Sequence, residues 1–223
     1  FAHGDVFMVA GILMVYISAS GPPLYVCIPL VLILTAVIGF TIERVAYKPL
    51  RNATRIAALI TAIGMSFLLE YGMVFFVGAQ SRAFPNILPS IRLEFFGGKV
   101  YITGKELLIY GVTIVLVVML QFIVKKTKTG KAMRAVAYDR DAAMLMGVNI
   151  DNTISATFAI GSALAGAAGV LVAIYYSAIN PLMGMTPGLK AFVAAVLGGI
   201  GIIPGAALGG LIMGLVETMV IAY

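Results

Sequence analysis

The sequence predicts an all-α polytopic membrane protein, a bundle of transmembrane helices. Of the 223 residues, 61% are apolar and 11% are charged, whereas a soluble domain carries about 25% charged residues. The apolar residues form continuous runs close to the ~20 residues that cross the hydrocarbon core of a bilayer. These runs lack the alternation of membrane β-strands, and a continuous apolar run in lipid has to be helical because every backbone N–H must be paired internally. This composition excludes an ordinary soluble enzyme and a disordered chain.

Five or six stretches approach the length of a membrane span. In chain order they are residues 6–19, which is short, 24–42, 56–77, which contains Glu70, 107–124, 154–176, which is rich in small residues, and 190–223. The last stretch is broken by glycines and by Pro204, which disrupts the interior of a helix. It therefore predicts a short half-helix followed by a full span from Gly205.

The two ends of the chain affect how many membrane spans the sequence predicts. The chain begins with Phe1 and ends inside an apolar run. We expect residues 1–223 to form a single transmembrane domain cut at both ends, so the number of spans is a minimum. A helix continued before residue 1 would lengthen the short first run.

The distribution of Lys and Arg predicts the orientation in the membrane. Residues 43–55 and 125–152 hold four and six basic residues, residues 80–106 hold four that are spread thinly, and residues 177–189 hold none. Because cytoplasmic loops carry an excess of Lys and Arg, the first two loops are expected in the cytoplasm and the last two outside. The net charge of +6 thus reflects orientation and argues against a nucleic-acid partner. Residues 91–102 partly alternate and predict a small hairpin.

Residues 125–152 contain a short helix with signals at both ends. Asp139 suits the N-cap position, and Asp141 falls in the first turn, where the helix dipole favours a carboxylate. Gly147 suits the position just after the last turn, so the predicted helix has about two turns. Three small or flexible apolar residues share one face at i, i+3 and i+4 spacing: Ala142, Leu145 and Met146.

A short capped helix with such a face suits a groove on another protein. The alternative is a basic loop held by anionic lipid, an attraction worth about 1 kcal/mol per basic residue near the surface. Lipid attraction accounts for the lysines of residues 125–131 but not for the capped helix. Asp151 is expected to cap the span that follows.

Several strings in this sequence resemble permeases of ABC importers. DAA at residues 141–143, followed after three residues by Gly147, resembles the cytoplasmic EAA-type loop of these permeases, with Asp where the family name has Glu. FAHGD at residues 1–5 resembles the start of the branched-chain amino-acid permease motif. GLKAFVAAVLGGIG at 188–201 and KAMRAVAYDRDAAMLMGVNID at 131–151 are similar to the H-type subunit of leucine/isoleucine/valine importers. The resemblance covers essentially the whole chain.

This resemblance implies a membrane-spanning subunit of an ATP-driven importer of branched-chain or related amino acids, in the bacterial inner membrane. It implies no catalytic residue in this chain, because ATP hydrolysis belongs to separate ABC ATPase subunits. The other expected partners are a second permease subunit, an extracytoplasmic substrate-binding protein and membrane lipid. Residues 125–152 would form the cytoplasmic coupling loop, and its ATPase-coupling residues would be Asp139, Asp141, Ala142, Ala143 and Gly147.

Two alternatives stay open at this point. The chain could be a permease of the same family for a sugar or an amide. It could also be an ion-coupled secondary transporter, which would use Glu70 or Glu217 as a proton relay and would need no ATPase.

Four polar residues in or beside apolar runs are candidates for the translocation path: His3, Asp5, Glu70 and Lys190. A charge at the bilayer centre costs about 2.5–3.5 kcal/mol on insertion scales, so Glu70 should face a cavity or a partner. His3 and Asp5 are expected at a broken helix, because Gly4 weakens helical continuity and irregular backbone at membrane depth is tolerated where it lines a cavity. Lys190 could instead anchor the last stretch at the headgroups.

Small residues four apart predict close packing of helices. The predicted packing glycines in the last stretch are Gly198, Gly201, Gly205 and Gly209. Residues 162–169, SALAGAAG, predict a second close-packing face.

Nothing in the sequence predicts a metal, cofactor or catalytic site. One histidine and one cysteine cannot supply a four-ligand His/Cys zinc site, and Cys27 lies in an apolar run as a small hydrophobe. The sequence contains no HExxH motif, no phosphate-binding loop and no plausible Ser/His/Asp set.

Overall fold

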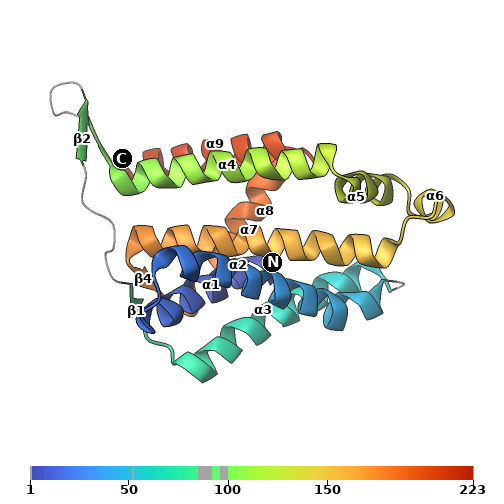
Figure 1. Cartoon of the computed structure of the whole chain (residues 1–223), viewed down its shortest axis with the longest axis horizontal. Helices are drawn as coiled ribbons and strands as arrows, with labels where there is room; N and C mark the ends of the chain where they lie inside the picture. Colours follow the sequence, from blue (N-terminus) through green and yellow to red (C-terminus); the bar gives the residue numbers. More distant parts are fainter. Residues whose placement is uncertain (1, 52, 85–91, 96–99, 223) are drawn as a thin grey trace.

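The computed structural model describes residues 2–51, 53–84, 92–95 and 100–222. Within these residues, six helices are long and apolar enough to cross a membrane, which confirms the predicted all-α bundle (Figure 1). They are α1 (Ala2–Ala19), α2 (Leu24–Ile42), α3 (Arg55–Val77), α4 (Gly104–Lys126), α7 (Ile150–Tyr176) and α9 (Ile203–Ala222). Phe1, which opens the FAHGD string, lies outside the described residues.

Shorter elements connect these helices. A π-helix, η1 (Glu43–Tyr47), and a 3-10 helix, η2 (Lys48–Leu50), continue α2. Three short α-helices are α5 (Lys128–Tyr138), α6 (Arg140–Leu145) and α8 (Met185–Leu197). The strands are β1 (Arg82–Ala83), β2 (Arg92–Phe95), β3 (Val100–Thr103) and β4 (Ala178–Ile179).

The predicted hairpin at residues 91–102 is confirmed in register. β2 pairs antiparallel with β3, and Leu93 lies opposite Ile102. Residue 91 and the turn at residues 96–99 lie outside the described part of the chain.

The core forms where α1 packs between α2, α3 and α7. Met8, Ile12 and Met14 of α1 are almost fully buried. The sequence of α1 is apolar on all its faces, as expected for a helix that others enclose. In Figure 1, α7 runs along the long axis, with α1, α2 and α3 on one side and α4 and α9 on the other, while α8 crosses between the two layers. The segments that precede and follow α7, residues 125–149 and 177–184, lie at its two ends.

Small residues on α7 let its neighbours approach closely. A Cβ placed on Gly166 would collide with Thr35 of α2, and one placed on Gly169 would collide with the carbonyl oxygen of Phe7 on α1. Ser162 is buried against Gly39 of α2. The predicted close-packing face at residues 162–169 is thus confirmed.

The last apolar stretch folds as a half-helix and a span, as predicted, with shifted boundaries. The half-helix α8 already begins at Met185, and α9 begins at Ile203. Pro204 is accommodated because it occupies the first turn of α9, where its missing N–H would have no helical partner. The intervening turn needs two glycines at positive φ, Gly199 at 88° and Gly201 at 95°.

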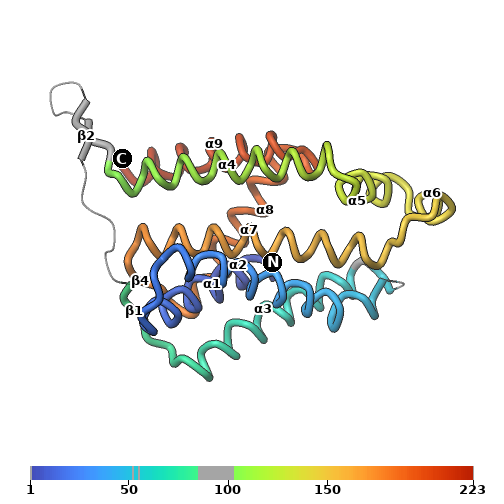
Figure 2. Tube along the Cα trace, viewed as in Figure 1, coloured from blue at the N-terminus to red at the C-terminus, as the bar shows by residue number. Residues whose placement is uncertain are grey.

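The loops gather at two opposite ends of the bundle. At one end, which we call the strand end, β1 pairs with β4, and Arg82 lies opposite Ile179. At the other, which we call the basic end, residues 43–55 meet residues 125–152. Figure 2 shows the chain leaving α4, turning through α5 and α6 beyond the ends of the other helices, and returning as α7. The structure thus groups the four loops in the two pairs predicted from their basic residues.

Candidate functional site

The helix α6 at the basic end is capped at both termini. The side chain of Asp139 accepts hydrogen bonds from the backbone N–H groups of Asp141 (2.9 Å) and Ala142 (3.0 Å), which confirms the predicted N-cap. After the last turn, Gly147 adopts a φ of 80° and donates to the carbonyl of Met144 at 3.0 Å. The next N–H, at residue 148, reaches back to the carbonyl of residue 143 at 3.0 Å, which completes a Schellman motif.

The apolar face of α6 is open to solvent. The exposed fractions are 89% for Leu145 and 84% for Met146, and Ala142 of the same predicted face is also exposed. Ala143 faces the opposite way and is 4% exposed. Nothing within the described chain covers this face, so α6 presents large apolar side chains where solvent or another protein can reach them.

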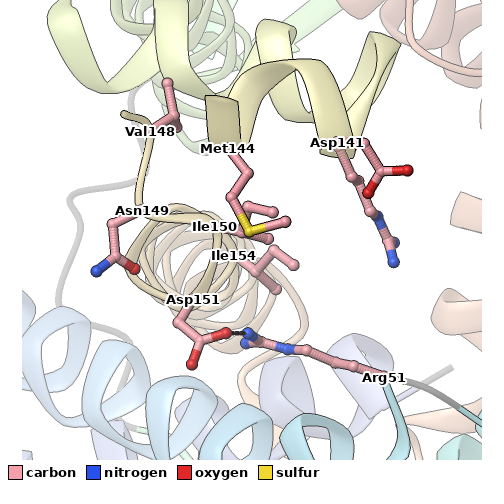
Figure 3. A pocket seen from close by; sticks show the side chains of 9 residues that line it. Arg51, Asp141, Met144, Val148, Asn149, Ile150, Asp151 and Ile154 are labelled. Atoms are coloured by element: carbon pink, nitrogen blue, oxygen red, sulfur yellow. Dashed lines mark hydrogen bonds and ion pairs between the residues drawn. The ribbon is translucent and has the colours of Figure 1, made fainter. Parts of the chain in front are cut away.

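A cleft of about 510 Å³ separates α6 from the first turns of α7. Figure 3 shows Met144 reaching from α6 toward Ile150 and Ile154 of α7. On the far side of the cleft, Arg51 points at Asp151, while Asp141 points away from that pair. The short helix therefore stands off α7 over a partly empty space, which leaves it room to shift.

The expectation that Asp151 caps α7 is wrong. Because α7 begins at Ile150, Asp151 already lies in its first turn, and Asn149 is the cap, accepting a hydrogen bond from the N–H of Asn152 at 3.0 Å. The carboxylate of Asp151 is free to bind Lys48 at 2.9 Å and Arg51.

A polar network around the buried Glu43 at the basic end escaped the sequence analysis. The guanidinium of Arg51 binds Glu43 as well as Asp151, and Ser155 donates a 2.5 Å hydrogen bond to Glu43. Glu43 is fully buried. One sequence signal pointed to this network: Glu43, a carboxylate, directly follows the apolar run of α2. In the sequence analysis, this loop was considered only for its basic residues.

Two candidates for the translocation path lie together between α1 and α3. Asp5 is fully buried and Glu70 is 7% exposed. Asp5 accepts a hydrogen bond from Ser66 and interacts electrostatically with Glu70. The structure thus joins two acidic side chains from distant parts of the sequence.

The other two candidates lie elsewhere. His3 packs against Phe158 of α7, with ring centroids 5.4 Å apart. Lys190 on α8 forms an ion pair of 2.5 Å with Glu217 on α9. Both side chains of this pair are more than two-fifths exposed, at 46% and 43%.

The predicted break in the first helix is wrong, because α1 is continuous from Ala2 through Gly4. The glycine serves a different purpose. A Cβ on Gly4 would lie 2.6 Å from the carbonyl oxygen of Gly184 and 2.7 Å from the Cα of Gly188. Gly4 is therefore a point of close backbone contact with the start of α8.

Three of the four predicted packing glycines lie where α8 and α9 meet. A Cβ on Gly205 would collide with the carbonyl oxygen of Gly198, and a Cβ on Gly198 would collide with the carbonyl oxygen of Gly205. A Cβ on Gly209 would collide with the carbonyl oxygen of Ala194. Gly201 requires a correction, since it lies in the turn at positive φ with no atom within 4 Å of a Cβ built on it. Its role is to form the turn.

No group of three or more His, Cys, Asp or Glu side chains that could hold a metal ion occurs among the residues that the structure describes.

Comparison with known proteins places the chain in a family. The family model described as branched-chain amino acid transport system / permease component matches residues 1–223. The high-affinity branched-chain amino acid transport system permease protein BraD of Pseudomonas aeruginosa is 39% identical over 98% of this chain and 75% of its own length. LivH of Escherichia coli (strain K12), a permease protein named for the same transport system, is 39% identical over the whole chain and 76% of its own length. A more distant relative, the fructose import permease protein FrcC of Rhizobium meliloti, is 30% identical over 73% of this chain. No solved structure matches this chain.

The six apolar helices and these relatives indicate a multi-pass inner-membrane protein. Proteins of this kind are transport subunits and not enzymes, and a separate ATPase subunit works with them. The chain belongs to the family of permease components of branched-chain amino acid transport systems.

Proposed function

We propose that this chain is the membrane-spanning subunit of an ATP-driven importer that translocates branched-chain or related amino acids. The substrate class comes from the relatives BraD and LivH, which are named for branched-chain amino acid transport and share 39% of their aligned residues with this chain. In this proposal, residues 1–223 act as one transmembrane permease domain. The basic end faces the cytoplasm, because cytoplasmic loops carry the excess of Lys and Arg.

The observation that carries the proposal is the solvent-open apolar face of the doubly capped helix α6. A six-residue helix is too short to be stable through its own hydrogen bonds, yet Asp139 and Gly147 hold it in shape at both termini. Leu145 and Met146 then extend into solvent, which is unfavourable unless a partner covers them. We assign the partner as the ATPase subunit, and residues 125–152 as the coupling loop that contacts it.

The proposed mechanism is alternating access. ATP binding closes the ATPase subunits, and α6 moves with them at the basic end. The small residues of α7 and of the α8–α9 hairpin let neighbouring helices repack without bulky side chains in the way. A second permease subunit completes the path, and a substrate-binding protein delivers the amino acid at the strand end.

The buried polar groups of α1 and α3 support a role in the path. Ionisable groups inside a membrane often mark substrate or ion pathways, and Asp5 and Glu70 lie close enough to interact between these helices. At the strand end, Lys190 lines a cavity of about 590 Å³ together with Phe7 and Asn180. The Lys190 ammonium is paired with Glu217, so a substrate carboxylate would compete with Glu217 for it, while the apolar walls suit the side chain of an apolar amino acid.

Uptake of labelled leucine by proteoliposomes that hold the complete complex tests the proposal. Uptake should require both ATP on the ATPase side and the binding protein on the other side. A second set of vesicles, with fructose as the labelled solute, measures specificity. Leucine uptake that survives ATP depletion and is abolished by an uncoupler would instead establish an ion-coupled transporter.

A further inference from the structure

We infer that Arg51 is a positioning residue that clamps the ends of α2 and α7 together at the basic end, so that a movement of α6 reaches both helices as one unit. This inference rests on the proposed function, since it concerns how the coupling step enters the membrane helices.

The geometry of the clamp is a fork. One terminal nitrogen of the Arg51 guanidinium binds the carboxylate of Glu43, and the other binds the carboxylate of Asp151. Glu43 opens the π-helix η1 that continues α2, whereas Asp151 belongs to the first turn of α7. A planar guanidinium can hold two carboxylates at fixed angles, which a lysine ammonium cannot do.

Burial makes this fork stiff. Glu43 is fully buried, and its second oxygen accepts the 2.5 Å hydrogen bond from Ser155, one turn along α7 from Asp151. A buried carboxylate is costly without its counter-charge, so Glu43 and Arg51 have a strong tendency to stay together. Asp151 is 46% exposed, so the stiffness of the fork comes from its Glu43 arm. In the neighbouring Lys48–Asp151 pair both side chains are exposed, at 37% and 46%, and such pairs contribute little.

The clamp lies where a displaced α6 would act. Arg51 and Arg140 of α6 line the same cleft, and both also line a second cavity that extends to Val136 of α5. Between the end of α6 and the start of α7 the chain has only residues 146–149. A displacement of α6 therefore pulls on the first turn of α7 at Asp151, and the fork passes it to α2 through Glu43.

Paired neutral substitution separates coupling from folding. The double variant Glu43→Gln with Arg51→Gln removes the fork and leaves no unpaired buried charge at Glu43. In proteoliposomes with the complete complex, we expect normal assembly and ATP hydrolysis, while the leucine transported per ATP hydrolysed falls at least fivefold. Arg51→Lys, which keeps the charge but loses the fork, should give an intermediate ratio.

Lys48→Gln is the matched control, because it also removes a cation from Asp151 but leaves the fork intact. Its transport ratio should equal that of the unchanged complex. A folded double variant with an unchanged ratio would overturn the inference and leave the network a purely structural role. If the unchanged complex shows no ATP-driven leucine uptake, it is the proposed function that fails.

A second measurement decides the matter if the double variant does not assemble. Spin labels on the exposed residues Thr41 and Asn152 report the distance between the clamped ends of α2 and α7 in the otherwise unchanged complex. That distance should be the same with and without ATP. An ATP-dependent change in it would show that the two helices move separately and would refute the clamp.

Discussion

Gly39 of α2 and Ser162 of α7 meet at a close approach of these two helices, where a Cβ on the glycine would occupy the space of the serine side chain. Ser162 is 1% exposed, so its side chain has no free space into which to retreat. The contact lies in the interior of the bundle, and it holds α2 against α7 one turn before Glu43, the residue of the clamp that continues α2.

Gly39→Ala should destabilise the protein by about 1–3 kcal/mol, the usual cost of overpacking a tight contact. Thermal unfolding in detergent would show this as a lower midpoint. Adding Ser162→Gly should restore most of the loss because it vacates the space. Gly64→Ala on α3 is the control, since nothing lies within 4 Å of a Cβ there, and an equal loss in that variant would contradict the packing argument.

Leu145→Asp should prevent the ATPase subunit from binding while leaving the permease folded. Leu145 is 89% exposed and makes no buried contact to lose, but a carboxylate in an apolar interface has to be desolvated. Copurification of the ATPase measures the effect, and a loss of tenfold or more is expected. Leu182→Asp at the strand end, where the side chain is 48% exposed, should copurify normally. Equal copurification of both variants would remove α6 from the interface.

Gly147→Val should weaken the same interaction by a different route. A β-branched residue at the φ of 80° costs about 1–2 kcal/mol or more, which would unravel the last turn of α6. Gly147→Asn should be milder because Asn tolerates this conformation. Gly78 has a φ of 85° and also lacks neighbours within 4 Å, but Gly78→Val should leave ATPase binding unchanged. If both valine variants bind the ATPase normally, the shape of α6 does not matter for docking.

Gly205→Leu should reduce the yield of folded protein severely, because its side chain would be driven into the backbone of Gly198. Size-exclusion chromatography of the detergent-solubilised protein would report the loss as aggregation. Gly201→Ala should also destabilise, but for a conformational reason, since the residue has a φ of 95° in open space. A well-folded Gly205→Leu variant would be incompatible with the α8–α9 contact described above.

Glu217→Gln tests the ion-coupled alternative. The Glu217 side chain is 43% exposed, and within the described part of the chain its ion pair is with Lys190. Removing the charge of Glu217 should therefore alter folding little. Leucine uptake should remain dependent on ATP and insensitive to an uncoupler. Abolished uptake with intact ATPase binding and hydrolysis would favour a proton relay at this position.

The sequence predicted the spans well because local composition determines them. Leu24–Ile42 was predicted with its observed bounds, since Gly21 and two prolines mark its beginning and the charge of Glu43 marks its end. The cap at Asp139 was equally accessible, because capping is a property of a few adjacent residues.

The errors have a common physical origin. Gly4 and Gly201 were misassigned because local spacing does not reveal whether a glycine breaks a helix, packs against backbone or forms a turn. The Arg51 network was missed because Arg51 and Asp151 are 100 residues apart, and no local pattern indicates that pairing. The helix α5 was hidden for a related reason, as its lysines gave the segment the composition of a loop.

The length of α8 has a consequence for backbone hydrogen bonding. Its 13 residues extend about 20 Å, which is well short of a hydrocarbon core of about 30 Å. A helix of this length that starts near one face ends at a depth where lipid offers no hydrogen bonds, and the glycine turn that follows has backbone groups to satisfy. The turn meets much of this need without water, since the N–H groups of Gly198, Gly199 and Ile202 donate to the backbone carbonyls of Ala194, Val196 and Gly199, so the α8–α9 hairpin carries its own hydrogen-bond partners to that depth.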